Sequence, residues 1–308
     1  MSASSGPSLV TSVCGIGLRN PVLAASGTFG YGVEFEKLVD LNALGGFVVK
    51  GLSREPIEGN PPPRIYETDA GMINSIGLQN MGVRAFVSQK LPALAKLDTA
   101  VLANVFGYDT GDYVEVVRVL EDHPGLAAYE LNVSCPNTSH GGIYFSSDPA
   151  LLGEVVSAVK RVARRPVIVK LSPNVAAIEP LARAAEASGA DALSLVNTFI
   201  ALAIDPHTRR PRIGAGFGGL SGPAIKPIAL RLVCQAARAV KIPVIGLGGI
   251  STGEDAAEFL IAGATAVQVG TASFWDPRSP LRIARELAAF LKQERVADVS
   301  QLVNTLKL

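Results

Sequence analysis

The sequence has few cysteines, few aromatic residues and little net charge. Its 308 residues include only 3 Cys and 6% aromatic residues, and 28 Lys and Arg stand against 27 Asp and Glu. A net charge of +1 without a basic stripe argues against a nucleic-acid partner. Cys14, Cys135 and Cys234 are odd in number and far apart, so we predict neither a disulfide framework nor a metal site.

Long apolar runs are also absent. The longest uncharged stretches, 1–18 and 259–275, are interrupted by Ser, Thr, Gly and Gln, whereas a membrane-spanning helix needs about 20 apolar residues. Residues 1–18 also lack the positively charged start of a secretory signal. With 48% hydrophobic and 18% charged residues, the composition excludes a disordered chain. We therefore expect a reduced, cytoplasmic, globular protein with no membrane attachment.

Short apolar runs alternate along the chain with amphipathic helical segments. The runs are 21–26, 45–51, 100–107, 129–136, 166–173, 191–198, 243–250 and 266–273. Their apolar residues are continuous, as expected for parallel strands covered on both faces. Helical spacing marks 148–163, 225–240 and 252–262, the last with Thr252 as N-cap. Eight such units predict a closed (β/α)8 TIM barrel, with 1–308 as a single domain and a hairpin at 9–19 closing the barrel floor.

Two connections are much longer than the others. Residues 58–82 follow the second predicted strand, and residues 200–222 follow the sixth. Long loops in a compact domain are usually functional or disordered, and the C-terminal face of a barrel is where active sites form. Because both loops are rich in Asn and Gly and weakly charged, we favour a functional role over plain surface.

Polar residues stand at the ends of nearly all the predicted strands. They are Ser26, Lys50, Asn104, Asn132, Ser134, Lys170, Asn197, Thr198 and Thr271. Taken alone, a rim lysine is as often a structural ion-pair partner as a functional group, and a rim asparagine more often clamps the backbone. Their convergence above one barrel favours a shared site, because buried polar groups need partners.

The last two strands end in glycine-rich turns that favour a phosphate site. GLGGI (246–250) and VGTAS (269–273) leave backbone N–H groups open to an anion, and Gly222 opens a helix whose dipole points the same way. Tight-turn glycines are the ordinary alternative. The GAGFGG run (214–219) is not a dinucleotide fingerprint, because no strand runs directly into it.

Cys135 ends the fourth strand in the motif NVSCPN. A lone cysteine is usually a small buried hydrophobic residue, which is our interpretation of Cys14 and Cys234. At a strand end among polar neighbours, however, the Cys135 thiol could act as a base or a nucleophile. No histidine stands at a strand end, so the sequence does not indicate a Cys/His dyad.

Seven motifs occur along the chain. In order, they are NSIGLQNMG, ELNVSCPN, VIVKLSPN, LVNTF, GGLSGPAIKP, PVIGLGGI and AVQVGTASF. Together they resemble the FMN-dependent dihydroorotate dehydrogenases, over the chain from about Leu9 to about Trp275. Cysteine at the base position is similar to the soluble class 1 enzymes. The GNPPPR stretch is similar to their NAD-linked branch, in which the catalytic subunit pairs with a subunit that carries FAD and a 2Fe-2S cluster.

The resemblance implies oxidation of dihydroorotate to orotate in de novo pyrimidine biosynthesis. Hydride would pass to FMN and a proton to Cys135. Electrons would then reach NAD through the partner electron-transfer subunit, and the catalytic chain would form a homodimer. FMN would be held by Ser26, Lys50, Gly51, Asn104, Asn132, Lys170, Val196, Gly222, Gly248, Gly249, Gly270 and Thr271. Substrate would meet Lys50, Asn74, Ser75, Ile76, Gly77, Leu78, Asn132, Asn197 and Thr198.

Other interpretations stay open at this point. The first is a fumarate-linked homodimer of the same family, and the second is another FMN barrel acting on dihydropyrimidines, such as a dihydropyrimidine dehydrogenase subunit or a tRNA dihydrouridine synthase. A barrel without redox activity could instead use Lys170 as a Schiff-base lysine. A non-catalytic binding barrel is the simplest alternative. A yellow purified protein would separate the flavin interpretations from the last two.

Overall fold

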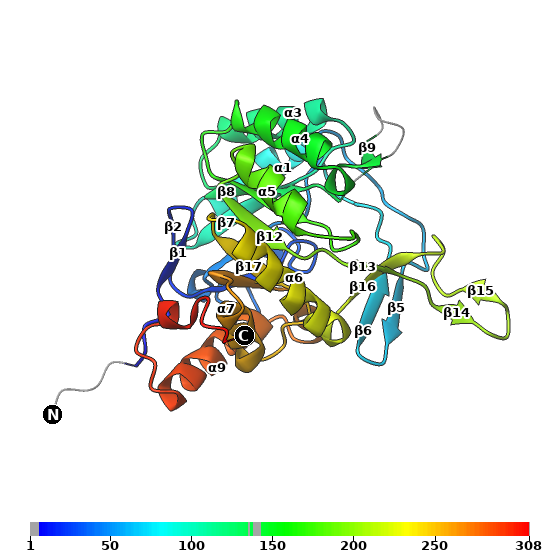
Figure 1. Ribbon diagram of the computed structural model, residues 1–308. Helices are drawn as coiled ribbons and strands as arrows, with labels where there is room; N and C mark the ends of the chain where they lie inside the picture. The colour runs from blue at the N-terminus through cyan, green and yellow to red at the C-terminus, as the bar shows by residue number, and fades with distance from the viewer. Residues whose placement is uncertain (1–5, 135, 138–142, 308) are drawn as a thin grey trace.

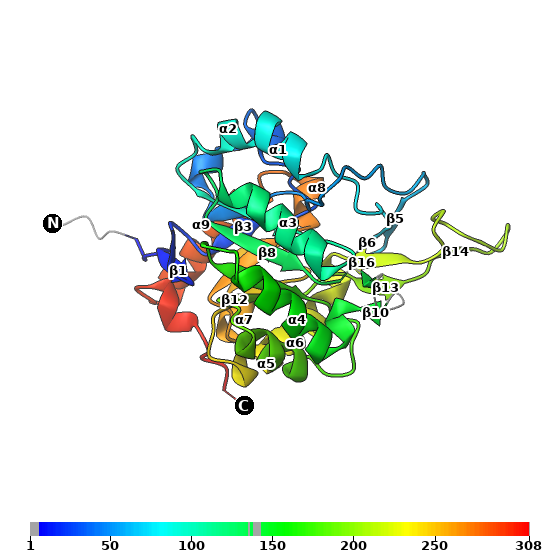
Figure 2. The ribbon, with the colours of Figure 1, turned by 90° about the horizontal axis from the view of Figure 1, so that it is seen from above.

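The computed structural model describes residues 6–134, 136–137 and 143–307. Eight parallel strands close into a barrel with helices packed around it (Figures 1 and 2). In order around the barrel the strands are β3 (Val22–Ala24), β4 (Gly46–Val48), β7 (Ala100–Val105), β8 (Ala128–Asn132), β11 (Val167–Leu171), β12 (Ala192–Leu195), β17 (Val244–Leu247) and β18 (Ala266–Val269). The structure thus confirms the predicted (β/α)8 barrel. Each strand lies within or next to its predicted run and ends earlier, because the last residues of each run leave the sheet at the barrel mouth.

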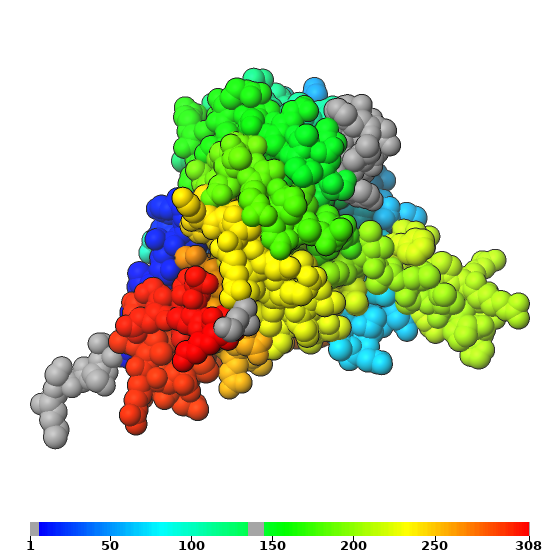
Figure 3. All heavy atoms as spheres, in the orientation of Figure 1, coloured from blue at the N-terminus to red at the C-terminus, as the bar shows by residue number. Residues whose placement is uncertain are grey.

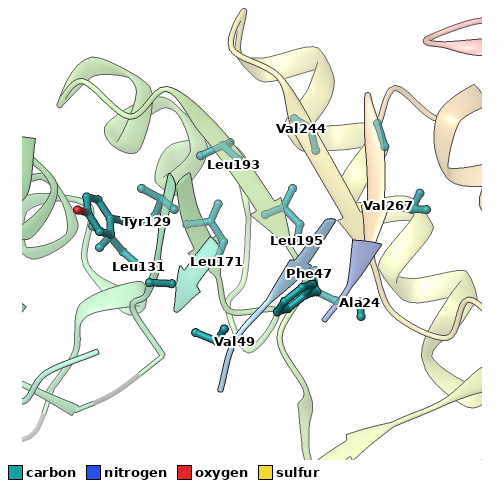
Figure 4. Packing of buried hydrophobic residues seen from close by; sticks show 14 of the residues in the cluster. Ala24, Phe47, Val49, Tyr129, Leu131, Leu171, Leu193, Leu195, Val244 and Val267 are labelled. Carbon is teal, nitrogen blue, oxygen red and sulfur yellow. The ribbon is translucent and has the colours of Figure 1, made fainter. Parts of the chain in front are cut away.

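Side chains of the barrel strands alternate between two apolar clusters. Those that point outward pack against the helices, and Figure 4 shows part of this layer, including Phe47, Val49, Tyr129, Leu131 and Leu193. Those that point inward form a smaller cluster that includes Leu23, Val48, Leu102, Ile168 and Ile245. The continuous apolar runs of the sequence therefore serve two cores at once, as buried parallel strands do.

Helices fill the connections between the barrel strands. They are α1 (Val83–Gln89), α2 (Leu91–Leu94), α3 (Thr110–Glu121), α4 (Pro149–Lys160), α5 (Glu179–Ala187), α6 (Lys226–Ala239), α7 (Gly253–Ile261), α8 (Ala272–Trp275) and α9 (Ser279–Gln293). The predicted N-cap Thr252 forms a capping box with Asp255 at the start of α7. Among the described residues, no helix combines the length and apolar character that crossing a membrane requires.

The predicted N-terminal hairpin is present at the barrel floor. It pairs β1 (Thr11–Val13) with β2 (Ile16–Leu18). Val13 and Leu18 are buried and join the inward-facing cluster of the barrel. Shorter elements are η1 (Val33–Phe35), η2 (Leu41–Ala43), β9 (Pro136–Asn137), β10 (Ile143–Tyr144), η4 (Phe145–Ser147), η5 (Pro223–Ile225) and η6 (Val299–Leu302). Because the floor is closed by apolar side chains, the cavity described below lies at the opposite end of the barrel.

The two long loops pair with each other over that open end. They form a four-stranded antiparallel sheet in the order β13 (Phe199–Ala201), β16 (Gly218–Ser221), β6 (Gly71–Asn74) and β5 (Ile65–Thr68). A Cβ on Gly218 would lie only 2.6 Å from the Asn74 carbonyl oxygen, and one on Gly219 would collide with Thr198. Close packing therefore explains the last two glycines of the GAGFGG run. The hairpin of β14 (Ile204–Asp205) and β15 (Arg210–Pro211) projects beyond this sheet (Figures 1 and 3).

Candidate active site

A cavity of about 800 Å³ lies at the C-terminal ends of the barrel strands, next to the four-stranded sheet. Every described residue that the sequence analysis assigned to cofactor or substrate lines it. They are Ser26, Lys50, Gly51, Asn74, Ser75, Ile76, Gly77, Leu78, Asn104, Asn132, Lys170, Val196, Asn197, Thr198, Gly222, Gly248, Gly249, Gly270 and Thr271. The remaining residue, Cys135, lies outside the described residues, although its neighbour Ser134 lines the same cavity.

One side of the cavity rests on a buried polar network. Asn104 and Lys170 line the cavity and also contact the carboxylate of Glu130, which is 0% exposed. Ser194 and Gln268 donate to the same carboxylate from two further strands. The sequence analysis missed Glu130, Ser194 and Gln268. The available signal was a glutamate inside an otherwise apolar strand.

Lys50 follows β4 and is held at the edge of the cavity by its backbone. Its N–H donates to the Gly30 carbonyl at 2.8 Å, and the preceding carbonyl, that of Val49, accepts from the Ser26 hydroxyl at 2.8 Å. Burial lowers the pKa of the Lys50 ammonium, and the positive charge of Arg64 lowers it further. No carboxylate contributes to this shift. Lys50 is therefore a partly buried cation that an anionic ligand would stabilise.

The loop at 74–78 is shaped by the GNPPPR stretch beside it. The Asn60 amide donates to the Ser75 carbonyl at 2.9 Å, and the Arg64 guanidinium donates to Gln79 Oε1 at 2.8 Å. Gly77 has a φ of 75°, and a Cβ there would lie 2.5 Å from Asn60 N. Ser75 Oγ is buried without a hydrogen-bond partner. Because such a group is costly, its position in a cavity wall indicates a ligand that completes it.

Amide side chains gather where β8 and β12 end. The Asn197 amide donates to Asn132 Oδ1 at 3.2 Å and to Ser134 Oγ at 3.0 Å. The segment after Asn197 is anchored in turn by Asn174, whose amide donates to the Thr198 carbonyl at 3.0 Å. These contacts place Asn132, Asn197 and Thr198 together directly beside the position of Cys135 in the chain. The sequence analysis did not single out Asn174.

Glycines form a second part of the cavity wall. Gly222, Gly248 and Gly249 have φ values of 99°, 130° and 79°, and a Cβ on Gly249 would lie 2.8 Å from the Gly222 carbonyl oxygen. Gly222 caps η5, which leads directly into α6. Gly270 differs, because its φ is not in the left-handed region and a Cβ would meet nothing closer than 3.8 Å. The protein itself therefore does not require glycine at position 270.

The other two cysteines lie away from the cavity. Cys14 belongs to the floor hairpin, and burial raises the pKa of its thiol to about 12. Cys234 lies in α6. Both are only partly buried, so our interpretation of them as buried hydrophobic residues was too strong. Neither thiol lines the cavity, so neither is a candidate for a role in the site. Among the described residues, no group of three or more His, Cys, Asp or Glu side chains is placed to hold a metal ion.

Comparison with known proteins gives the same family throughout. The profile of the family described as dihydroorotate dehydrogenase matches residues 8–291. A protein of Solibacter usitatus, provisionally named dihydroorotate dehydrogenase A (fumarate), is 80% identical over 98% of this chain and 99% of its own. Proteins of Citrifermentans bemidjiense and Geobacter sulfurreducens, both named dihydroorotate dehydrogenase B (NAD(+)), catalytic subunit, are 53% and 54% identical over 98% of this chain and 99% of their own. The chain belongs to the dihydroorotate dehydrogenase family and is an oxidoreductase.

Proposed function

We propose that this chain, as one FMN-binding barrel domain over 1–308, oxidises dihydroorotate to orotate in pyrimidine biosynthesis. The observation that carries the proposal is the convergence of the strand-end polar residues and the glycines on one cavity in a member of this family. A barrel that binds no ligand would have no need, in one cavity wall, of a lysine whose charge no carboxylate offsets and of a buried hydroxyl that has no partner among the described residues.

The cavity wall fits FMN. The bare backbone at Gly222, Gly248, Gly249 and Gly270, together with Thr271, suits the phosphate, because glycine lets N–H groups approach an anion. Ser26, Lys50, Gly51, Asn104, Asn132, Lys170 and Val196 would surround the ring system. FMN, when bound, supplies the hydride acceptor that amino-acid side chains lack.

The remaining residues explain how a dihydropyrimidine would be held. Asparagine side chains offer both a donor and an acceptor, so Asn74, Asn132 and Asn197 match the alternating N–H and C=O groups of the ring. Lys50 would pair with the substrate carboxylate, which also offsets the cost of its own burial. The Ser75 hydroxyl and the adjoining loop to Leu78 would close over the substrate.

Cys135 is the proposed base. The proton to be removed lies next to a ring carbonyl and is only weakly acidic, so a positioned base is needed. Asn132, Ser134 and Asn197 form the polar cluster beside this position in the chain, and such neighbours stabilise a thiolate. Lys170 would place positive charge near the ring that receives the hydride.

The electron acceptor is proposed to be NAD, reached through a partner subunit that carries FAD and a 2Fe-2S cluster. Relatives named as NAD(+)-linked catalytic subunits support this assignment. The fumarate-linked alternative is supported by the name of the 80% identical relative. A cytoplasmic homodimer agrees with either, and the exposed apolar side chains Ile200, Ile204 and Phe217 on and beside the projecting hairpin suit contact with a second copy.

Replacing Cys135 tests the base. In C135A, we expect FMN to stay bound while flavin reduction by dihydroorotate slows by about 10²- to 10⁴-fold, since that is what general base catalysis contributes. C135S should keep some activity, displaced to higher pH, because a hydroxyl ionises at higher pH than a thiol and is therefore a poorer base near neutrality. Anaerobic stopped-flow absorbance measures both, with C234A as the unaffected control. Wild-type reduction by C135A would rule out this role.

Gly270 tests the cofactor site. The protein has room for a methyl group at this position, so G270A should leave the free energy of unfolding of the apoprotein within about 1 kcal/mol of wild type. The methyl group should nevertheless weaken FMN binding at least tenfold, because it blocks the backbone that meets the phosphate. Fluorescence titration measures the dissociation constant. G17A is the matched control, since a Cβ at Gly17 meets nothing within 4 Å. Unchanged FMN affinity in G270A would remove Gly270 from the site.

Replacing Lys50 tests whether its charge destabilises the folded apoprotein and is needed to bind an anionic ligand. Because the pKa of Lys50 is lowered by folding, its charged form destabilises the folded apoprotein below that pKa, and the cost disappears as pH rises. K50M should therefore stabilise the apoprotein at neutral pH by about 1 kcal/mol, with the gain shrinking at alkaline pH, while binding of orotate is lost.

Lys226 provides the contrast. Burial alone would lower its pKa, but hydrogen bonds to Asp255 and Glu258 outweigh burial and raise it. K226M should accordingly lower the free energy of unfolding by about 1–3 kcal/mol, because it removes the charged donor of both hydrogen bonds. Urea unfolding of both variants at several pH values measures the differences, and a K50M protein that is less stable than wild type would show that Lys50 has a structural role.

Assays of electron transfer to NAD and to fumarate test whether the chain belongs to the NAD-linked or the fumarate-linked branch of the family. The purified single chain loaded with FMN should bleach with dihydroorotate but fail to reduce NAD, because its 3 cysteines are too few to hold an iron–sulfur cluster that would carry the electrons onward. Co-purification from the native cell should recover the FAD- and cluster-bearing subunit, and its addition should restore NAD reduction. Rapid fumarate reduction by the single chain would favour the alternative, and NAD reduction by it would contradict the proposal.

A further inference from the structure

The Glu130 carboxylate is surrounded by donors contributed by four other strands of the barrel. Asn104 Nδ2 lies 2.8 Å from Oε1 and Lys170 Nζ lies 3.5 Å from it. Ser194 Oγ lies 2.9 Å from Oε2 and Gln268 Nε2 lies 2.7 Å from it. Because Glu130 is 0% exposed, its carboxylate is held entirely by this ion pair and these hydrogen bonds inside the barrel.

Stability alone does not account for such a group. A buried ion pair repays its desolvation only with good geometry, and apolar side chains of similar size are often equally or more stabilising at such positions. The inward-facing layer nearer the floor shows that option, because it is filled by Leu102, Ile168 and Ile245. Glu130 therefore requires a reason beyond packing.

The two carboxylate oxygens have different kinds of partner. Asn104 and Lys170, which contact Oε1, both line the cavity, whereas Ser194 and Gln268, which contact Oε2, do not. Oε2 is thus tied to the barrel framework and Oε1 to the cavity wall. Glu130 connects the two.

The contacts with Glu130 determine which atoms of Asn104 and Lys170 are available to a ligand in the cavity. Because Nδ2 of Asn104 donates to Glu130, its Oδ1 is left as an acceptor. Lys170, which is 6% exposed, lies far enough from Oε1 to keep protons available for a ligand, while the carboxylate offsets its charge.

We propose that Glu130 is a positioning residue for the flavin: it orients the Asn104 amide and balances the charge of the Lys170 ammonium in the cavity wall that would hold the cofactor. This inference rests on the proposed FMN site. The negative charge of Glu130 would then oppose the negative charge that a flavin gains on reduction, so it would lower the midpoint potential of the bound cofactor.

Two variants separate the charge from the positioning. In E130Q, the Ser194 hydroxyl and the Gln268 amide, whose Oε1 has no partner, can each turn to accept from the new N–H, so the geometry is kept and only the charge is lost. We expect a more positive midpoint potential with FMN affinity close to wild type. In E130M, the buried Asn104 amide loses its acceptor, and we expect FMN to bind about ten- to a hundredfold more weakly.

S194A is the matched control. It removes one hydrogen bond to the same carboxylate from the framework side, so it should lower thermal stability without changing the potential or the FMN dissociation constant. Potentiometric titration and fluorescence titration measure these quantities. A wild-type potential in E130Q, or wild-type FMN affinity in E130M, overturns the inference, and E130Q decides alone if E130M does not fold. Failure of wild-type apoprotein to bind FMN would instead overturn the proposed function.

Discussion

The closed barrel imposes the constraint on which the rest of the structure depends. Once eight parallel strands close, every second side chain of each strand points into an interior that is sealed at the floor. A polar side chain at such an inward-pointing position must either pair with an inward-pointing residue of another strand or lie at the mouth of the barrel, where it lines the cavity. Glu130 is confined to the first choice, Asn132 reaches the mouth, and Asn104 and Lys170 do both.

Features that are local in the chain were predictable from the sequence. An apolar, β-branched run that ends in one polar residue defines both a buried strand and a rim position, which is why Ser26, Lys50 and Asn104 were found and do line one cavity. The cap at Thr252 is equally local, since a capping box involves only four consecutive residues. Closure of the barrel then brings rim positions together without further information.

Features that depend on distant pairing were not predictable in the same way. The sheet beside the cavity joins strands from two loops, and its Asn74 amide donates to the carbonyl of Gly219, 145 residues away. The Glu130 network requires the register of several strands at once, because its partners come from β7, β11, β12 and β18. A single glutamate within YELN carries no sign of which strands surround it.

The Glu130 carboxylate inside the barrel and the polar groups at its mouth differ in how they are paired. The Glu130 carboxylate has a partner for each oxygen. Nearer the mouth, no carboxylate of the described residues offsets the charge of Lys50, and Ser75 Oγ has no hydrogen-bond partner among them. If packing were the only demand, the groups at the mouth would be paired or replaced by apolar residues, as they are at the floor. Rigidity below and unmet hydrogen-bonding capacity above are what a site needs to hold a polar, flat ligand in one orientation. Asn104 and Lys170 belong to both groups, because they contact Glu130 and also line the cavity. Through these two residues, the buried network around Glu130 determines which donors and acceptors the cavity wall offers to a ligand.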